Sequence, residues 1–464
     1  MTSVVIVGGG PGGYEAALVA AQLGARVTVV DRDGLGGSAV LTDCVPSKTL
    51  IATAELMSQV EGSVELGLRF DDDPSDDHVT VDLRRVNARV KTLAASQSTD
   101  ITRRLERESV EVIPGSGRLA GTDRVEVTHS DGGRSVLDAD VVLLSTGAHP
   151  RVSDAARPDG QRILTWEQVY DLRELPERLV VVGSGVTGAE LAGAYLALGS
   201  RVTLVSSRDR VLPGEDADAA AVLEDVFTRR GMRVLSSSRM SAVRRTQAGV
   251  AVDLSDGRTV EGTHCLLALG SVPNTGDLGL DTVGVQLDER GFISVDRVSR
   301  TTARGVYAAG DCTGVLMLAS VAAMQGRIAM WHALGDAVAP LSLDHVSANV
   351  FTSPEIATVG VSQAAIDSGA VDGYAVMLPL QGNARAKMQG IRDGFVKLFC
   401  RTGSGTVIGG VVVAPAASEL IHPVALAVAC TLTADQVANT FTVYPSLTGS
   451  LAEAARRLHH HGTA

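Results

Sequence analysis

The sequence predicts an α/β protein with two β-α-β units followed by a C-terminal α+β domain. A buried apolar run that ends in glycine, at residues 3–8, is followed by an alanine-rich helix and a second strand. The same order returns about 175 residues later, from residue 179. From residue 346 the sequence pattern changes and predicts Gly-rich strands (406–414) and a helical stretch (416–430). These landmarks predict segments 1–150, 151–270, 271–345 and 346–464.

Composition excludes several classes of protein. A chain of 464 residues is long enough for about three domains. The net charge of −12 and an aromatic content of 3% argue against a surface for nucleic acid or anionic membranes. No apolar run approaches membrane-spanning length, and residues 71–77 form an acidic loop. Five scattered cysteines without a Cys-x-x-Cys pair fit a reducing cytoplasm and no zinc site. The histidines at 459–461 are interpreted as a tail feature, so no metal is expected.

The first unit comprises a strand at 3–8, a helix at 12–24 and a strand at 26–31. Its connecting loop, Gly8-Gly9-Gly10-Pro11-Gly12-Gly13, satisfies G-x-G-x-x-G. Glycine at the first position permits a tight turn, at the second a close approach to pyrophosphate, and at the third helix–strand packing. Asp31 ends the second strand, where a carboxylate can accept from a ribose hydroxyl. This context predicts a dinucleotide site.

The second unit comprises a strand at 179–183, a helix at 187–199 and a strand at 201–205. Its loop is Gly183-Ser184-Gly185-Val186-Thr187-Gly188. No acid stands at the ribose position after the second strand; Ser206, Arg208 and Arg210 occur there instead. Arginine pairs with phosphate, so these residues favour NADPH over NADH. The alternative without a ligand role is that the two arginines lie in a solvated loop.

Three further segments complete the predicted domains. Strands at 139–147 and 264–270 each end at glycine and close a β-α-β region. A small-residue strand ends at Gly310-Asp311, and a helix is expected at 319–333. Long helical segments are expected within 81–108. The carboxylate of Asp311, at a strand end, suits a phosphate or ribitol hydroxyl as well as a plain turn.

Together these motifs resemble class I pyridine nucleotide-disulfide oxidoreductases, the flavoprotein family of dihydrolipoamide dehydrogenase. The resemblance covers essentially the whole chain and includes Cys44-Val45-Pro46-Ser47-Lys48 and Ser145-Thr146-Gly147. It implies two Rossmann-like domains that bind FAD and NAD(P)H, and a C-terminal α+β dimerisation domain. It also implies that Lys48 and Glu190 pair beside the reactive edge of the flavin. The cofactor-binding residues so assigned are Gly8, Gly10, Pro11, Gly12, Gly13, Asp31, Arg32, Gly37, Ser38, Lys48, Gly117, Ser145, Thr146, Gly147, Gly183, Gly185, Val186, Thr187, Gly188, Glu190, Ser206, Arg208, Gly270, Gly310, Asp311, Leu318 and Ala319.

The chain departs from the family at each position of its dithiol chemistry. The family has Cys-x4-Cys before Pro-Ser-Lys, whereas Ala39 stands five residues before Cys44 here. The family's C-terminal His-Pro and later Glu are replaced by Tyr444 and Gly449. Tyrosine, with a pKa near 10, is a poor general base at neutral pH. The chain therefore resembles the NAD(P)H quinone reductase branch, which lacks the redox disulfide.

This resemblance implies a cytoplasmic homodimer that passes a hydride from NAD(P)H to FAD and then electrons to a quinone. Lys48, Glu190, Cys44 and Tyr444 are the candidate catalytic residues. Cys44 is interpreted as a relic, a donor of charge to the flavin, or a peroxide-reactive thiol, and Tyr444 as a quinone contact or a packing residue. Three alternatives stay open: a single-thiol peroxide or oxygen reductase, a flavin redox sensor with little turnover, and a disulfide reductase that uses another thiol.

Overall fold

The structure, a computed structural model, describes residues 1–67 and 79–461. The acidic loop predicted at 71–77 lies outside the described residues. The chain forms two compact units, each assembled from three segments. Unit 1 comprises Met1–Thr49, Asn87–Arg151 and Gly270–Ser342, and unit 2 comprises Leu50–Val86, Val152–Leu269 and Leu343–Ala464.

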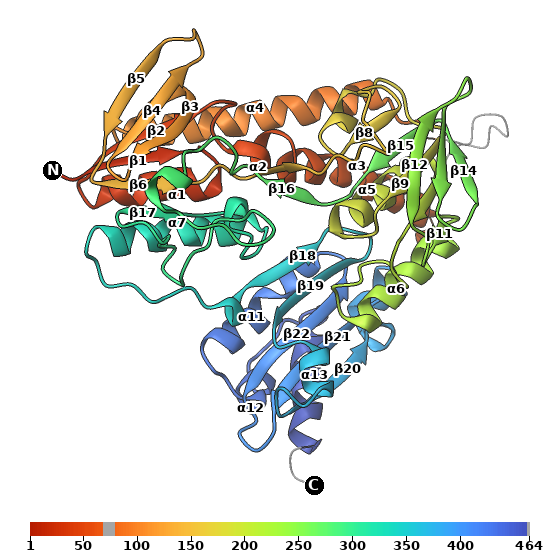
Figure 1. The fold of residues 1–464 in the computed structure, drawn as a ribbon. Coiled ribbons are helices and arrows are strands. Elements are labelled where there is room, and N and C mark those ends of the chain that lie inside the picture. Colours follow the sequence, from red (N-terminus) through yellow and green to blue (C-terminus); the bar gives the residue numbers. More distant parts are fainter. Residues whose placement is uncertain (68–78, 462–464) are drawn as a thin grey trace. The chain divides into compact units, whose positions relative to one another are not determined.

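Unit 1 is built on a seven-stranded sheet in the order β17-β6-β1-β2-β3-β4-β5 (Figure 1). The strands from β17 to β3 are parallel, and the second half of β3 turns to pair antiparallel with β4. Strands β7 and β16 form a separate antiparallel ladder. The strand bounds are β1 Ser3–Val7, β2 Arg26–Asp31, β3 Glu111–Gly121, β4 Arg124–His129, β5 Arg134–Asp138, β6 Val141–Leu144, β7 Ala148–Pro150, β16 Ser271–Pro273 and β17 Val306–Ala308.

Helices α1 and α7 of unit 1 lie in close contact beside this sheet (Figure 1). A Cβ atom added at Gly326 of α7 would lie 2.0 Å from the carbonyl oxygen of Gly12 in α1, so glycine is needed where the helices meet. The long α4 begins at a cap in which the Asp82 carboxylate accepts from the backbone N–H of Arg85. The helix bounds are α1 Pro11–Gln22, α2 Gly37–Leu41, α3 Cys44–Ser63, α4 Leu83–Arg107 and α7 Ala319–Ala333. Of these, α3 continues into unit 2 and α4 begins there.

The middle segment of unit 2 carries a five-stranded sheet in the order β11-β10-β9-β15-β8. All of its pairings are parallel, and β12, β13 and β14 form an antiparallel sheet of their own. Parallel pairing and strands buried on both faces are typical of a doubly wound domain. The bounds are β8 Ile163–Thr165, β9 Arg178–Val182, α5 Val186–Ala197, β10 Arg201–Val205, α6 Ala217–Arg229, β11 Arg233–Leu235, β12 Met240–Arg245, β13 Val250–Leu254, β14 Thr259–Gly262 and β15 His264–Leu267.

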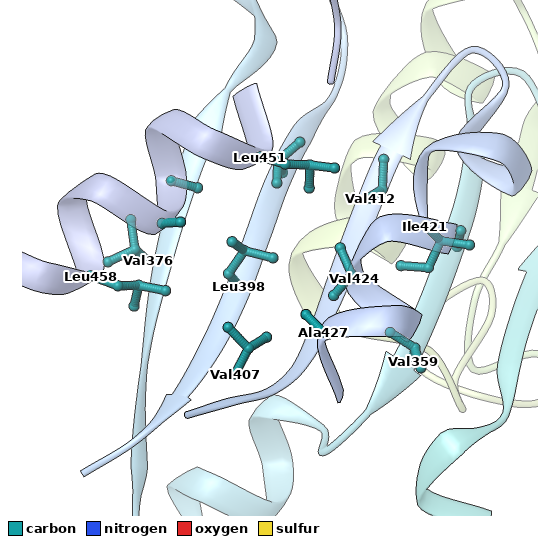
Figure 2. Packing of buried hydrophobic residues seen from close by; sticks show 14 of the residues in the cluster. Val359, Val376, Leu398, Val407, Val412, Ile421, Val424, Ala427, Leu451 and Leu458 are labelled. Atoms are coloured by element: carbon teal, nitrogen blue, oxygen red, sulfur yellow. The ribbon is translucent and has the colours of Figure 1, made fainter. Parts of the chain in front are cut away.

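The C-terminal segment of unit 2 is an antiparallel sheet in the order β18-β19-β22-β21-β20, covered by helices. Figure 2 shows Leu451 and Leu458 of α13 and Val424 of α11 packed with Leu398 and Val412 of the sheet. The bounds are β18 Ser347–Val350, β19 Glu355–Gly360, α8 Gln363–Asp367, β20 Gly373–Pro379, α9 Ala384–Met388, β21 Phe395–Arg401, β22 Val407–Ala414, α10 Ala417–Leu420, α11 His422–Ala429, α12 Ala434–Ala438 and α13 Gly449–His461.

The predicted α/β class and its βαβ units are confirmed, with differences at the ends of elements. The helical stretch expected at 416–430 is two helices, because Pro423 lies in the first turn of α11, where its missing N–H costs nothing. The strand expected to end at Gly310 is limited to Val306–Ala308. The helical segments expected within 81–108 are the single helix α4.

Candidate active site

The first glycine loop joins β1 to α1 in unit 1. Gly8 has φ +103°, and a Cβ there would lie 2.2 Å from the Ser145 carbonyl oxygen. A Cβ at Gly13 would lie 1.9 Å from the carbonyl oxygen of Gly8. At Gly10, by contrast, no atom lies within 4 Å of the Cβ position. Two glycines thus close the turn, and the third leaves open space beside the helix N-terminus, as a bound pyrophosphate requires.

Asp31 fastens this loop to the turn after β2. Its Oδ2 accepts from the backbone N–H of Gly9 at 2.7 Å. Its Oδ1 accepts from the N–H groups of Asp33 and Gly34 at 2.9 and 2.6 Å. The neighbouring Arg32 is exposed and pairs with Asp33 at 3.0 Å. The carboxylate therefore organises the loop in addition to the ribose role expected of it.

Two amide side chains that the sequence analysis missed hold the other turns around this loop. Asn274 donates to the carbonyl of Thr146 at 2.8 Å, and the Thr146 hydroxyl donates to the carbonyl of Asn274 at 2.7 Å. The buried Gln325 of α7 accepts from the N–H of Gly310 at 2.9 Å. Both amides act on backbone groups, which leave no local sequence pattern.

Asp311 follows the turn that Gln325 holds. Within the described residues its carboxylate accepts no side-chain or backbone hydrogen bond, and burial alone raises its pKa. Asp311 is half-buried, so its carboxylate oxygens remain free to accept hydrogen bonds. A ligand hydroxyl at this position would satisfy Asp311, which fits the role predicted for it.

The second glycine loop, in unit 2, repeats the geometry of the first. Gly185 has φ −72° and ψ −173°, against −68° and −176° at Gly10. A Cβ at Gly188 would lie 1.8 Å from the Gly183 carbonyl oxygen, whereas the Cβ position of Gly185 is open. Val186 and Thr187 form the first turn of α5. Both loops are therefore shaped to receive a pyrophosphate.

Ser206 and Arg208 differ in what they can offer a cofactor. Ser206 is fully buried, and its hydroxyl lies 2.7 Å from that of Ser184 in the glycine loop. It also accepts from the N–H of Arg208 at 3.1 Å. The side chain of Arg208 is exposed. Arg208 is therefore open to a 2′-phosphate, whereas the Ser206 hydroxyl is held inside the loop. The phosphate contact expected of each residue stays a prediction.

The dithiol position of the family contains one sulfur here. Cys44 is half-buried at the start of α3, and Ala39 lies on α2. No disulfide joins cysteines in the part of the chain that the structure describes. Burial raises the pKa of Cys265 to about 12 and that of Cys312 to about 11. These two thiols stay protonated at neutral pH and are poor nucleophiles.

The remaining predicted catalytic residues lie on different parts of the fold. Lys48 is half-buried one turn after Cys44 in unit 1. Glu190 of α5, in unit 2, is 3% exposed and accepts from the N–H of Phe351 at 2.9 Å. Tyr444, also in unit 2, is 85% exposed. The pairing of Lys48 with Glu190 stays a prediction.

Other predicted cofactor residues frame the two loops. A Cβ at Gly37, in the first turn of α2, would lie 2.9 Å from the Cα of Gly10, so α2 starts against the first loop, with Ser38 following. Leu318 precedes α7, and Ala319 begins it. Gly270 has φ +83° and its carbonyl accepts from the N–H of Arg151. Gly117, on β3, is buried against Val7, so packing already explains its glycine.

Comparisons with known proteins agree with this geometry. Residues 2–326 match the family described as pyridine nucleotide-disulphide oxidoreductase, and residues 346–455 match its dimerisation domain. The NAD(P)H dehydrogenase (quinone) of Mycobacterium tuberculosis H37Rv is 57% identical, over 99% of this chain and 94% of the relative. The dihydrolipoyl dehydrogenase of Chlorobaculum tepidum is 34% identical, over 97% of this chain and 96% of the relative.

A crystal structure of LpdA from Mycobacterium tuberculosis superposes with a TM-score of 0.94 at 57% identity, over 99% of this chain and 100% of that one. The chain belongs to the pyridine nucleotide-disulphide oxidoreductase family, which confirms the resemblance. Members of this family use FAD and NAD(P)H, and the two glycine loops fit these cofactors. Among residues 1–67 and 79–461, no helix is long and apolar enough to cross a membrane.

Proposed function

We propose that the chain is an FAD-dependent NAD(P)H:quinone oxidoreductase without disulfide reductase activity. The observation that carries the proposal is the combination of two intact dinucleotide loops with Ala39, Tyr444 and Gly449 in place of the family's dithiol residues. The 57% identical relative that is named NAD(P)H dehydrogenase (quinone) supports it.

The overall reaction is NAD(P)H + H⁺ + quinone → NAD(P)⁺ + quinol. Bound FAD supplies the electron transfer between nicotinamide and acceptor. The protein's part is to bind and orient: the first loop, Asp31, Thr146 and Asp311 would hold FAD, and the second loop would hold the nicotinamide nucleotide. Lys48 and Glu190 are proposed to set the polarity beside the reacting ring.

Disulfide exchange needs a thiolate and a second sulfur within reach, with Cα atoms about 5.5–6 Å apart. Position 39 supplies no sulfur, and the family's histidine, which would move the proton, is a tyrosine at 444. A quinone needs neither, because it accepts electrons without a covalent bond to sulfur. The substitutions therefore favour an acceptor other than a disulfide.

We propose that the working enzyme is a cytoplasmic homodimer. The dimerisation-domain match at 346–455 and three exposed side chains on one C-terminal segment, Phe441, Val443 and Tyr444, support the dimer. The scattered cysteines, none of which forms a disulfide in the described part of the chain, suit a reducing compartment. In a dimer, Tyr444 could donate a hydrogen bond to a quinone carbonyl.

The test measures oxidation of NADPH and NADH by the FAD-loaded protein with menadione, lipoamide and oxidised glutathione. We expect kcat/KM for menadione about 100-fold or more above that for either disulfide. Turnover of lipoamide or glutathione at the menadione rate would contradict the proposal. The variant Cys44→Ala tests the single-thiol alternative. We expect its quinone turnover to persist. If the variant loses turnover and the native protein reduces peroxide, a peroxide reductase that uses the Cys44 thiol is favoured. Fast flavin reduction with no acceptor turnover would favour a redox sensor.

A further inference from the structure

An exposed turn of unit 2, residues 441–445 between α12 and α13, carries Tyr444. The Tyr444 side chain is 85% exposed. No residue from 441 to 445 forms a hydrogen bond within the parts of the chain that the structure describes. Just before the turn, the hydroxyl of Thr440 donates to the carbonyl of Gln436 in α12 at 2.8 Å. The turn is therefore held at its ends, and Tyr444 lies close to the second of them.

The anchor nearest to Tyr444 is Ser446, two residues later. The side-chain Nδ2 of Asn383 donates to the Ser446 carbonyl at 3.0 Å and to the hydroxyl of Ser450 at 2.8 Å. Ser450 is 2% exposed in the first turn of α13. Pro445 separates Tyr444 from Ser446, and its ring limits φ to about −65°. Few free backbone torsions therefore lie between the phenol and this anchor.

Asn383 is itself fixed by its other polar groups. Its Oδ1 accepts from the backbone N–H groups of Arg385 and Ala386 at 2.8 and 3.1 Å, which caps α9. Its own backbone N–H donates to the Leu380 carbonyl at 2.8 Å. The amide thus uses both of its donors and both acceptor positions, and a flipped amide would set its oxygen against a carbonyl oxygen. One side chain therefore connects the turn between β20 and α9 to the turn that carries Tyr444.

We propose that Asn383 is a positioning residue for quinone reduction: it holds Tyr444 so that the phenol can donate a hydrogen bond to the acceptor carbonyl. The inference rests on the proposed function, in which Tyr444 contacts the quinone. A phenol on an untethered turn would lose backbone entropy at each encounter with a quinone, whereas a tethered one has lost it on folding. Asn383 acts through Tyr444 and does not itself contact the acceptor.

Asn383→Asp separates the two halves of this amide. The carboxylate keeps the acceptors that cap α9, but it has no donor for the Ser446 carbonyl. Gln381→Glu is the matched control, because it makes the same amide-to-acid change on the same turn. Gln381 is exposed, and its Nε2 donates to the Arg392 carbonyl at 3.3 Å and not to residues 441–450.

Fluorine NMR of the FAD-loaded protein that contains 3-fluorotyrosine measures the mobility of Tyr444. The signal of Tyr444 is the one that is missing in Tyr444→Phe. We expect Asn383→Asp to narrow this line at least about twofold, because the phenol gains freedom, and Gln381→Glu to leave it unchanged. An unchanged line in Asn383→Asp would overturn the proposal.

Stopped-flow kinetics measures the two half-reactions separately. In Asn383→Asp, reduction of the flavin by NADPH should stay within about twofold of the native rate, and reoxidation by menadione should slow about tenfold. In the Tyr444→Phe background the same substitution should have no further effect, since both changes remove one interaction. Reoxidation at the native rate in Asn383→Asp would overturn the proposal. Equal slowing with and without the Tyr444 hydroxyl would also overturn it, because that result would show a general structural defect.

Failure of the proposed function has a different signature. A native protein that does not reduce menadione would contradict the proposed function, and the link from Asn383 to an acceptor would fall with it. The line width of Tyr444 depends on no acceptor, so it decides separately whether Asn383 holds this side chain.

Discussion

At the scale of single residues, we propose that Arg208 sets the preference between NADPH and NADH. It is exposed after β10, where Ser206 faces inward and no acid occupies the ribose position. Arg208→Gln removes the cation that would pair with a 2′-phosphate. We expect kcat/KM for NADPH to fall about tenfold to 100-fold while that for NADH changes less than about twofold. Equal losses with both donors in steady-state assays would contradict this role.

The buried thiols make a second prediction at this scale. Burial holds the pKa of Cys265 near 12 and that of Cys312 near 11, so both should resist alkylation in the native protein at pH 8. The exposed Cys430 should react first, and all five cysteines should react after denaturation. Mass spectrometry of timed iodoacetamide labelling checks this order. Because these thiols ionise near pH 9 only when unfolded, their contribution to stability is complete below pH 9 and is lost as pH rises toward their folded values.

The roles of residues could be predicted where they depend only on neighbouring residues in the sequence. The glycines of both loops follow from spacing alone, because each turn needs a missing Cβ at a fixed offset. Asn274 and Gln325 could not be predicted, since their side-chain amides bind backbone groups 128 and 15 positions away in sequence. The burial of the Ser206 hydroxyl could not be predicted either, because sequence does not tell which way a hydroxyl at a strand end points.

At the scale of elements, the strand–loop–helix turn of unit 2 contains one glycine that the fold requires and one that nucleotide binding requires. A Cβ at Gly188 would meet the Gly183 carbonyl oxygen at 1.8 Å, whereas one at Gly185 would meet nothing within 4 Å. Gly188→Ala should therefore lower thermal stability clearly, since backbone has to move. Gly185→Ala should fold as the native protein does but raise KM for NADPH about tenfold or more, because its methyl fills the space that the pyrophosphate needs.

Calorimetry and steady-state kinetics on the two variants test this division. Each variant is the control for the other, since both add one methyl group to the same loop. A Gly185→Ala protein that binds NADPH normally would contradict the placement of the pyrophosphate.

Element types followed from periodicity, but element ends did not. The β-α-β order could be predicted because apolar runs indicate the buried strands and helices, and glycines mark where these elements end. The break between α10 and α11 depends on Pro423 and on packing against the C-terminal sheet. Such ends are set by tertiary contacts that a local pattern does not contain.

At the scale of the molecule, a buried ion pair joins two sequence-distant segments of unit 2. Lys397 of β21 is 3% exposed and lies 2.8 Å from Asp216, which caps α6. Lys397→Met leaves the Asp216 charge buried without its cation, so we expect a loss of about 3–5 kcal/mol in the free energy of unfolding. Arg229→Met is the matched control, because the exposed pair of Arg229 with Asp393 joins the same segments and should contribute about 0–1 kcal/mol. Urea unfolding compares the two, and equal losses would contradict the importance of burial.

Exposed apolar side chains in the C-terminal segment concern the assembly of the whole molecule into a dimer. Phe441 is fully exposed and Val443 is 79% exposed on a segment between α12 and α13, within the dimerisation-domain match. Burying such a side chain yields about 1.5–3 kcal/mol, so we propose that this segment packs against the partner chain. Each side chain occurs twice in a two-fold dimer, so the double variant Phe441→Ser, Val443→Ser should weaken dimerisation by up to about 6–12 kcal/mol, enough to give monomers at micromolar concentration.

Sedimentation equilibrium measures this change directly and without reference to activity. The control is Val136→Ser with Val152→Ser, which removes two exposed valines that lie outside residues 346–464. The control should remain dimeric, because solubility changes alone do not dissociate an interface. If the Phe441 variant also remains dimeric with an unchanged dissociation constant, the segment lies outside the interface, and Tyr444 loses its proposed route to a quinone. If it dissociates and quinone turnover falls in proportion to the monomer fraction, the acceptor site requires both chains.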